Sequence, residues 1–196
     1  KTTVALALMA AFRARGQRVQ PFKIGPDFID PGFHTRVTGR ASRNLDGWML
    51  SRDYNAERFT RSIQDAQMAI IEGVMGLFDG YSGTDEAGSS AEMAKWLGLP
   101  VILVVDAGSM ARSAAALVYG YCRFDKDLRV AGVIFNRVGS PTHYQYLVTA
   151  MAASLPDVAV LGGIPRDRQV TLPERHLGLV MADELDLDID WLTRLR

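Results

Sequence analysis

The sequence predicts an α/β fold with a doubly wound, mostly parallel sheet, and three observations support this prediction. Strand-like runs alternate along the chain with helical patterns of about 10 to 15 residues. Several runs, most clearly residues 101–106 (VILVVD), are almost wholly apolar, as strands covered on both faces are. The chain also opens with Lys1-Thr2-Thr3 followed directly by a helical pattern, which is typical of a P-loop NTPase.

Lys1, Thr2 and Thr3 match the end of the phosphate-binding loop G-x-x-x-x-G-K-[ST]. In such a loop the backbone N–H groups surround the phosphates, the Lys reaches the β- and γ-phosphates, and the hydroxyl holds Mg²⁺. The apolar pattern from Val4 to Gly16 places Lys1 at a helix N-terminus, which favours anions. We therefore predict that Lys1, Thr2 and Thr3 bind nucleotide, and we expect the loop's glycines upstream of Lys1.

Composition excludes several classes of protein. The chain has 196 residues, of which 48% are hydrophobic, and its 22 Lys and Arg balance its 22 Asp and Glu. This balance argues against a nucleic-acid or membrane surface, and no apolar run approaches the ~20 residues that a membrane span needs. The single Cys excludes an internal disulfide, so we expect a reducing, cytoplasmic environment.

A strand at residues 19–24 is followed by the segment 25–32 (GPDFIDPG), which we expect to be an irregular loop because it holds two prolines and two glycines. Ligands of open α/β sheets bind at the carboxyl ends of strands. Lys23, Asp27 and Asp30 are therefore expected to face the same crevice as Lys1. The alternative is an ordinary turn in which Asp is a capping residue.

Residues 34–44 contain His34, Arg36, Arg40 and Arg43 and no acid. Because a guanidinium matches a carboxylate bidentately, this stretch is predicted to bind a carboxylated substrate. The alternative is a solvated surface.

A predicted helix at 55–65 leads to a buried strand at 68–71, which ends in Glu72 and the glycine-rich segment 73–80. P-loop proteins place a Mg²⁺-associated carboxylate at such a position, so Glu72 is a candidate metal ligand. A purely structural carboxylate is the alternative. Asp79 lies in the same segment.

The rest of the chain continues the alternation. Helices are predicted at 89–97, 109–124 and 141–154, with Ser109 as an N-cap, and strands at 101–106, 129–135 and 158–165. Asn136 follows the strand at 129–135 directly. We expect one ATP-binding domain over residues 1–182, and a C-terminal helix or linker over residues 183–196.

Three segments resemble the cobyrinic acid a,c-diamide synthases and their hydrogenobyrinic and nickel-sirohydrochlorin relatives. They are KIGPDFIDPGFH at 23–34 with SRNLD at 42–46, EGVMGLFDG at 72–80, and LPERHLGLV at 172–180. The first segment is long enough to be highly specific, and the likeness covers essentially the whole chain.

The resemblance implies the fold of dethiobiotin synthetase, a P-loop α/β domain that binds ATP and Mg²⁺. In this family the a- and c-side-chain carboxylates of a corrin-type tetrapyrrole are activated as acyl phosphates and amidated with ammonia. A class I glutaminase domain supplies that ammonia, and we expect it to lie outside this chain. The resemblance does not decide whether the protein forms a homodimer.

Site roles follow from the resemblance. Lys1 and Lys23 would act on the phosphates, Thr2, Glu72 and Asp27 would hold Mg²⁺, and Asn136 would recognise the base. Asp27, Asp30 and Asp79 would orient the substrate, ammonia or a second metal ion. The predicted substrate-binding residues are His34, Arg36, Arg40, Arg43 and Asp46.

Two other functions remain open at the level of sequence. A dethiobiotin synthetase-like ligase would phosphorylate a small carbamate and would have little use for the cations of residues 34–43. A partitioning-type ATPase would use the same fold as a nucleotide-gated dimer switch. A membrane-associated version would usually add a basic amphipathic helix, whereas residues 183–196 are rich in acids.

Overall fold

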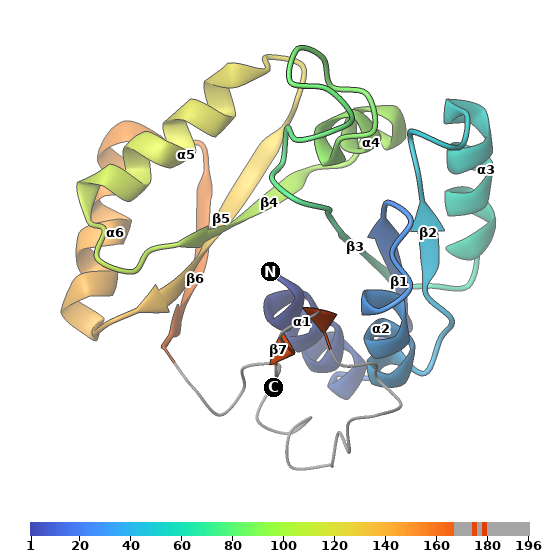
Figure 1. Cartoon of the computed structure of the whole chain (residues 1–196). Coiled ribbons are helices and arrows are strands. Elements are labelled where there is room, and N and C mark those ends of the chain that lie inside the picture. The colour runs from blue at the N-terminus through green and yellow to red at the C-terminus, as the bar shows by residue number, and fades with distance from the viewer. Residues whose placement is uncertain (167–173, 176–177, 180–196) are drawn as a thin grey trace. The chain divides into compact units, whose positions relative to one another are not determined.

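The computed structural model describes residues 1–166, 174–175 and 178–179, in two compact units. Residues 1–97 belong to the first unit with the described part of residues 170–196, and residues 98–169 to the second. Each unit is described by itself below, with the labels of Figure 1.

The first unit is built on a parallel three-stranded sheet of order β2-β1-β3. Its elements in chain order are α1 (Thr2–Ala14), β1 (Val19–Ile24), α2 (Asp30–Thr38), β2 (Arg43–Leu45), α3 (Arg52–Ser62), β3 (Met68–Glu72) and α4 (Ser90–Leu97). The register pairs Lys23 of β1 with Glu72 of β3 on one side and with Asn44 of β2 on the other. The charged ends of β1 and β3 are thus direct neighbours.

Helices cover both faces of this sheet (Figure 1). On one face, Leu6 and Met9 of α1 and Phe33 of α2 pack with Val19 of β1 in a buried core. On the other face, Phe22 of β1 and Met93 of α4 belong to a second buried core, and α3 packs partly buried side chains against it. Successive β1 side chains therefore point to opposite sides.

The second unit is a parallel sheet of order β4-β5-β6 with two helices. Its elements are β4 (Val101–Asp106), α5 (Arg112–Phe124), β5 (Val130–Val138), α6 (Pro141–Ser154) and β6 (Ala159–Pro165). The helices α5 and α6 pack against each other and against β5 (Figure 1). Phe135, Leu147 and Met151 are buried.

A short antiparallel pair, β7 (Glu174–Arg175) and β8 (Gly178–Leu179), is the described part of the LPERHLGLV segment. The helix predicted at 183–196 lies outside the described residues. No helix in the described part of the chain is long and apolar enough to cross a membrane.

The predicted fold class, parallel strands flanked by helices, is confirmed, but the expectation of an irregular loop over residues 25–32 is wrong at its end. Helix α2 begins at Asp30, and Pro31 occupies its first turn, where a missing N–H costs nothing. Asp27 Oδ1 accepts the backbone N–H groups of Ile29 and Asp30, at 2.7 and 3.2 Å. The helix ends at Gly39, whose φ of 71° is left-handed.

Three further elements differ from the prediction. The three-residue strand β2 was not predicted, because so short a run carries no periodicity. Ser109 is not a helix cap: it has a φ of 61°, and α5 begins only at Arg112. Strand β5 also extends past Phe135, so that Asn136 lies within it.

Candidate functional site

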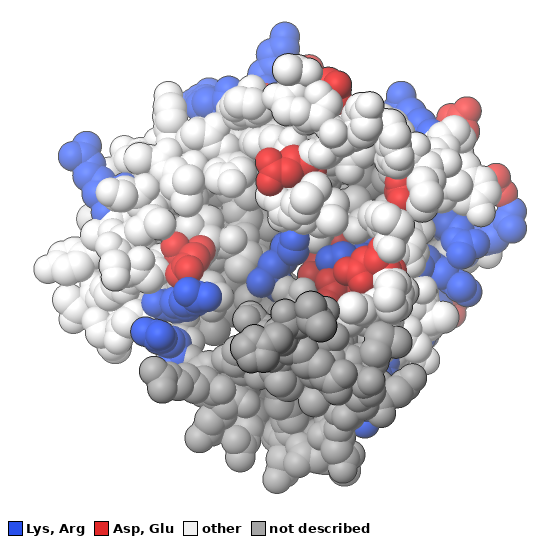
Figure 2. Space-filling view, viewed as in Figure 1, with Lys and Arg blue, Asp and Glu red and all other residues white. Residues whose placement is uncertain are grey.

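The candidate site lies at the carboxyl ends of β1 and β3, where the amino ends of α1 and α2 meet them. Lys23 and Glu72 come from the two strands, and Thr2 and Asp30 are the first residues of the two helices. His34 reaches the group from the second turn of α2. We call these five residues the Lys23 cluster. Acidic and basic side chains lie against one another on this face of the molecule (Figure 2).

Lys23 is the centre of the cluster and is almost completely buried. Its Nζ donates to Asp30 Oδ2 at 2.6 Å, to Glu72 Oε1 at 3.3 Å and to the carbonyl of Gly73 at 3.3 Å. Asp27 Oδ2 is 3.8 Å away. Burial disfavours the ammonium, but the charges of Glu72 and Asp30 outweigh it and raise the pKa of Lys23. Lys23 is therefore a fixed positive charge.

Glu72 has a partner on each carboxylate oxygen. Thr2 Oγ1 donates to Oε1 at 2.6 Å, and His34 Nε2 lies 2.7 Å from Oε2. His34 is completely buried, and its Nδ1 lies 3.2 Å from Ser42 Oγ. Burial alone would raise the pKa of Glu72, but the His34 hydrogen bond, the charge of Lys23 and the Thr2 hydroxyl lower it to about 2.

Asp30 differs from Glu72 in that one of its oxygens has no partner. Oδ2 accepts from Lys23 and lies 3.4 Å from Thr2 Oγ1, whereas Oδ1 is buried without a hydrogen bond to any described residue. Burial and the negative charge of Glu72 raise the pKa of Asp30. A buried oxygen without a partner is costly, and a ligand that met it would relieve that cost.

The amino end of α1 fits a phosphate. No side chain among the described residues caps this helix, and the first hydrogen bond of its backbone is from Ala5 N–H to the carbonyl of Lys1. The N–H groups of the first turn are therefore available to an anion. Lys1 Nζ lies close by, donating to the carbonyl of Met75 at 3.0 Å, and burial and the charge of Lys23 lower its pKa.

The oxygens of the cluster also fit a hard divalent cation. Thr2 Oγ1 gives its proton to Glu72, so its lone pairs can face a metal. Among the described residues, no three His, Cys, Asp or Glu side chains form a metal-binding group. Mg²⁺ typically takes one or two protein ligands and completes its shell with phosphates and water.

The other predicted acids accept hydrogen bonds from backbone N–H groups. Besides its contacts at the start of α2, Asp27 has its carbonyl held by Asn44 Nδ2 at 2.6 Å. Asp79 Oδ2 accepts the N–H of Gly76 at 2.9 Å, and the buried Asp46 accepts the N–H groups of Trp48 and Met49 through Oδ1. Asp27 is within reach of the Lys23 cluster, whereas Asp46 and Asp79 make no hydrogen bond to it.

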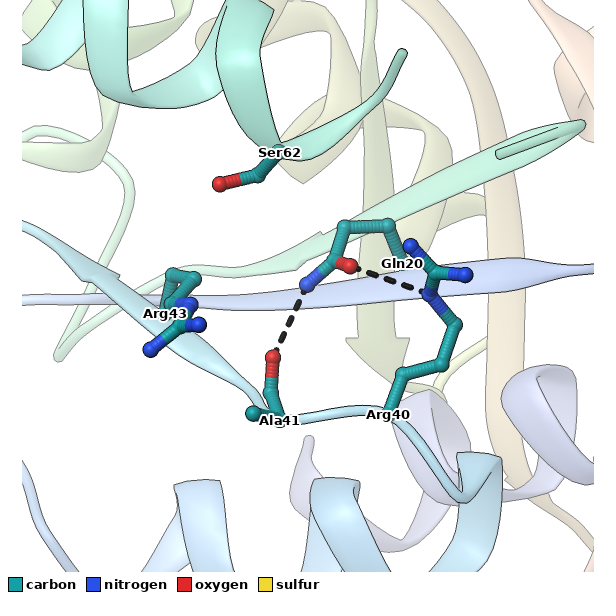
Figure 3. Close-up of a pocket in the computed structure, with 5 residues that line it drawn as sticks. All are labelled: Gln20, Arg40, Ala41, Arg43 and Ser62. Atoms are coloured by element: carbon teal, nitrogen blue, oxygen red, sulfur yellow. Dashed lines mark hydrogen bonds between the residues drawn. The ribbon is translucent and has the colours of Figure 1, made fainter. Parts of the chain in front are cut away.

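His34, Arg36, Arg40 and Arg43, which are predicted to bind a carboxylated substrate, do not lie together in one patch. His34 is buried against Glu72, and Arg36 is exposed on α2. Arg40 and Arg43 line a hollow with Gln20 and Ser62, on the face of the sheet that α3 covers (Figure 3). The alternation of β-strand side chains puts Arg43 and Lys23 on opposite faces.

Asn136, predicted to recognise the base, lies in the second unit, where β5 pairs it with Asp106. In the first unit, sequence reasoning missed Ser42, which contacts His34, and Asn44, which joins β2 to the loop before α2. Asn44 lies next to Lys23 in register, and only the pairing of the unpredicted strand β2 could have indicated it.

The fold and the site define a nucleotide-binding domain of the P-loop class. The chain belongs to the family described as the CobQ/CobB/MinD/ParA nucleotide binding domain, which it matches over residues 1–180. The solved structure of chloroplast FtsY from Physcomitrella patens matches 85% of the chain and 56% of its own length, with a TM-score of 0.59 at 16% identity, and supports the fold.

Curated relatives show which members of this broad family the chain is similar to. The chain is 51% identical over its whole length to cobyrinate a,c-diamide synthase of Syntrophotalea carbinolica, covering 42% of that protein. It is 49% identical to hydrogenobyrinate a,c-diamide synthase of Mycobacterium bovis, over 94% of the chain and 41% of that protein. The chain thus spans about two fifths of the length of these relatives. The resemblance to the cobyrinic acid a,c-diamide synthases is confirmed.

Proposed function

We propose that this chain is the ATP-dependent half of a ligase that amidates the a- and c-side-chain carboxylates of a cobyrinic-type tetrapyrrole. The observation that carries the proposal is the Lys23 cluster at the amino end of α1, together with relatives named cobyrinate and hydrogenobyrinate a,c-diamide synthase. A carboxylate is a poor electrophile, and phosphorylation gives it a leaving group that ammonia can displace.

The proposed role of each residue in the site follows from its charge. Lys1 and the N–H groups of α1 would hold the phosphates of ATP, and Thr2 with Glu72 would hold Mg²⁺. When bound, MgATP supplies the phosphoryl group and neutralises its charge. Lys23 would stabilise negative charge that develops between the nucleotide and the carboxylate, in a site whose donors are already oriented.

Asp30 and Asp27 are the groups best placed to meet the substrate or ammonia. Asp30 Oδ1 has no hydrogen-bond partner among the described residues, and Asp27 is partly exposed at the end of β1. We assign His34 to positioning Glu72, because its complete burial leaves it no surface for a macrocycle. A glutaminase domain outside this chain would supply the ammonia in the cytoplasm.

The test is amidation with an external ammonia source. The protein that contains this chain, given ATP, Mg²⁺, an ammonium salt and a corrin-type polycarboxylate, should lower the substrate's mass by about 1 Da for each OH replaced by NH₂. Glu72→Gln should reduce turnover by on the order of 10² or more, because it removes a negative charge from the metal site. Glu57→Gln, on the exposed face of α3, is the matched control.

Two outcomes would reject the proposal. Formation of dethiobiotin from 7,8-diaminopelargonate and CO₂, without amidation of any tetrapyrrole, would establish a dethiobiotin synthetase-like ligase. ATP hydrolysis coupled to dimerisation, with no acceptor carboxylate required, would indicate a partitioning-type ATPase.

A further inference from the structure

The hollow lined by Arg40 and Arg43 has features of a second binding site. It encloses about 310 Å³ between the start of β1, the segment before β2 and the end of α3, and its walls are Gln20, Arg40, Ala41, Arg43 and Ser62 (Figure 3). Every side chain on these walls except that of Ala41 is polar. Two of the five residues are arginines, whose planar forks suit carboxylate and phosphate groups.

Arg40 already binds one carboxylate. Its Nη1 and Nη2 donate to the two oxygens of Asp65 at 2.8 and 2.7 Å, so the pair is bidentate. Its Nε donates to Gln20 Oε1 at 3.1 Å. Asp65 therefore neutralises Arg40. The pair also shows that the two Nη groups of Arg40 are oriented to bind an oxyanion from the solvent side.

The side-chain amide of Gln20 orients the guanidinium of Arg40. Its side chain is buried, and its Nε2 donates to the carbonyls of Ala41 and Pro21 at 3.0 and 3.1 Å (Figure 3). The amide cannot turn without losing these bonds, so Oε1 stays directed at Arg40 Nε. The floor of the hollow is thus rigid before any ligand arrives, which reduces the entropic cost of binding.

Arg43 is the cation of the hollow that no acid in the described part of the chain neutralises. Its side chain is exposed, and its guanidinium makes no hydrogen bond or ion pair with the residues that the structure describes. Ser62 lies on the opposite wall, and its Oγ donates to the carbonyl of Arg58 at 2.8 Å. With Arg40 paired to Asp65, Arg43 leaves the described lining of the hollow with one positive charge in excess.

We propose that this hollow binds a small oxyanion, a carboxylate or a phosphate, with Arg43 as its main contact and Arg40 as the second. The ligand would enter beside Asp65 and would compete with Asp65 for Arg40. Because Arg43 and Lys23 lie on opposite faces of the sheet, the site is separate from the one proposed for nucleotide and substrate. The proposal does not depend on the proposed enzymatic activity.

The test is binding of defined anions to the metal-free and nucleotide-free protein. Inorganic phosphate and the tricarboxylate tricarballylate should each give saturable binding in calorimetry, and the tighter one identifies the natural class of ligand. Arg43→Gln should weaken that binding by about tenfold or more, since a charge-assisted bidentate pair is lost. Arg52→Gln, which removes the same charge at the exposed start of α3, should leave binding unchanged.

Asp65→Asn sharpens the test, because it removes the internal competitor for Arg40. It should tighten binding of the same anion severalfold, whereas a merely non-specific charge effect would be matched by Asp53→Asn in the first turn of α3. Far-UV circular dichroism would confirm that each variant is folded. Equal affinities for wild type, Arg43→Gln and Arg52→Gln, or no saturable binding of either anion, would overturn the proposal.

Discussion

At the scale of single residues, Glu72 keeps its negative charge in a buried site because three partners hold it. Thr2 and His34 each contact one oxygen, and Lys23 contributes its charge at 3.3 Å. Burial acts against ionisation, so the charge depends on these partners. Removing one of these partners should change the ionisation of Glu72 before it changes the fold.

His34 offers a direct test of this dependence. If Glu72 holds Mg²⁺ as proposed, His34→Leu should lower turnover by about 10- to 100-fold and raise the Mg²⁺ concentration needed for half-maximal activity, because it removes a hydrogen bond that orients the metal-binding carboxylate. His34→Gln, which retains a donor toward Glu72 Oε2, should recover most of the loss. Kinetics over a Mg²⁺ titration measure both effects. An unchanged Mg²⁺ dependence in His34→Leu would show that His34 is only a packing residue.

Acid should destabilise the metal-free protein through Glu72. Its pKa falls from 4.5 to about 2 on folding, so its contribution is fully present above pH 4.5 and is lost as the pH falls toward 2. At about 1.4 kcal/mol per pKa unit, this is on the order of 3 kcal/mol. The raised pKa of Asp30 acts in the opposite direction, because protonation relieves its burial cost as the pH falls.

Urea unfolding of Glu72→Gln between pH 5 and pH 2 measures this contribution, with EDTA present and Glu57→Gln as the exposed control. Glu72→Gln should lose less stability than wild type over that range, although it starts from a lower value. A decline as steep as that of wild type would contradict the assignment of the acid sensitivity to Glu72.

Single residues also show what the sequence could predict. Lys1, Thr2, Lys23 and Glu72 were identified because each lies at a helix start or a strand end, which local patterns reveal. The contact of His34 with Glu72 joins residues 38 apart in the chain, and its burial follows from α2 packing on the sheet. The sequence shows His34 only as one more cation beside three arginines.

At the scale of elements, α2 explains the main error in the predicted fold. Proline and glycine at 31 and 32 favour an irregular loop, yet Pro31 occupies the first turn, where its missing N–H and fixed φ are compatible with a helix. The two acids that sequence reasoning placed in one loop therefore have different roles. Asp27 precedes the helix and bonds its N–H groups, and Asp30 is its first residue.

The segment between β3 and α4 depends on Gly80. A Cβ there would lie 2.3 Å from the carbonyl oxygen of Ala87, so Gly80→Ala must displace backbone. In the wild type, the neighbouring Tyr81 donates its N–H to the same carbonyl at 2.9 Å and stacks on Trp48 with ring centroids 3.9 Å apart. The substitution should disturb both contacts.

Tryptophan fluorescence and thermal unfolding should detect this change. Gly80→Ala should alter the emission attributable to Trp48, identified with a Trp48→Phe variant, and lower stability by about 1 to 3 kcal/mol through overpacking. Gly83→Ala is the matched control, because its Cβ would meet nothing within 4 Å. Identical fluorescence and stability in the two variants would contradict the role assigned to Gly80.

At the scale of the whole molecule, charge is balanced and local. The 22 basic and 22 acidic residues cancel at pH 7. Charged side chains gather in two small groups. In the Lys23 cluster a buried ammonium pairs with Asp30 and Glu72. In the hollow, the guanidinium of Arg43 is in excess among the described lining residues. Each group acts over a few ångströms, since salt screens exposed charges beyond about 8 Å.

A balanced surface predicts weak association with polyanions. Non-specific binding to duplex DNA requires several Lys and Arg side chains along one face, each displacing a counterion, and the equal number of acids in this chain repels the phosphates. Fluorescence anisotropy of a labelled 20-base-pair duplex at 150 mM salt should show no binding tighter than about 10⁻⁴ M. Arg43→Gln should not change this result, although it should weaken binding of small oxyanions in the hollow that we propose as their site. Tighter binding with a steep dependence on salt would show that the described cations combine into a continuous surface, and it would contradict the local arrangement of charge argued above.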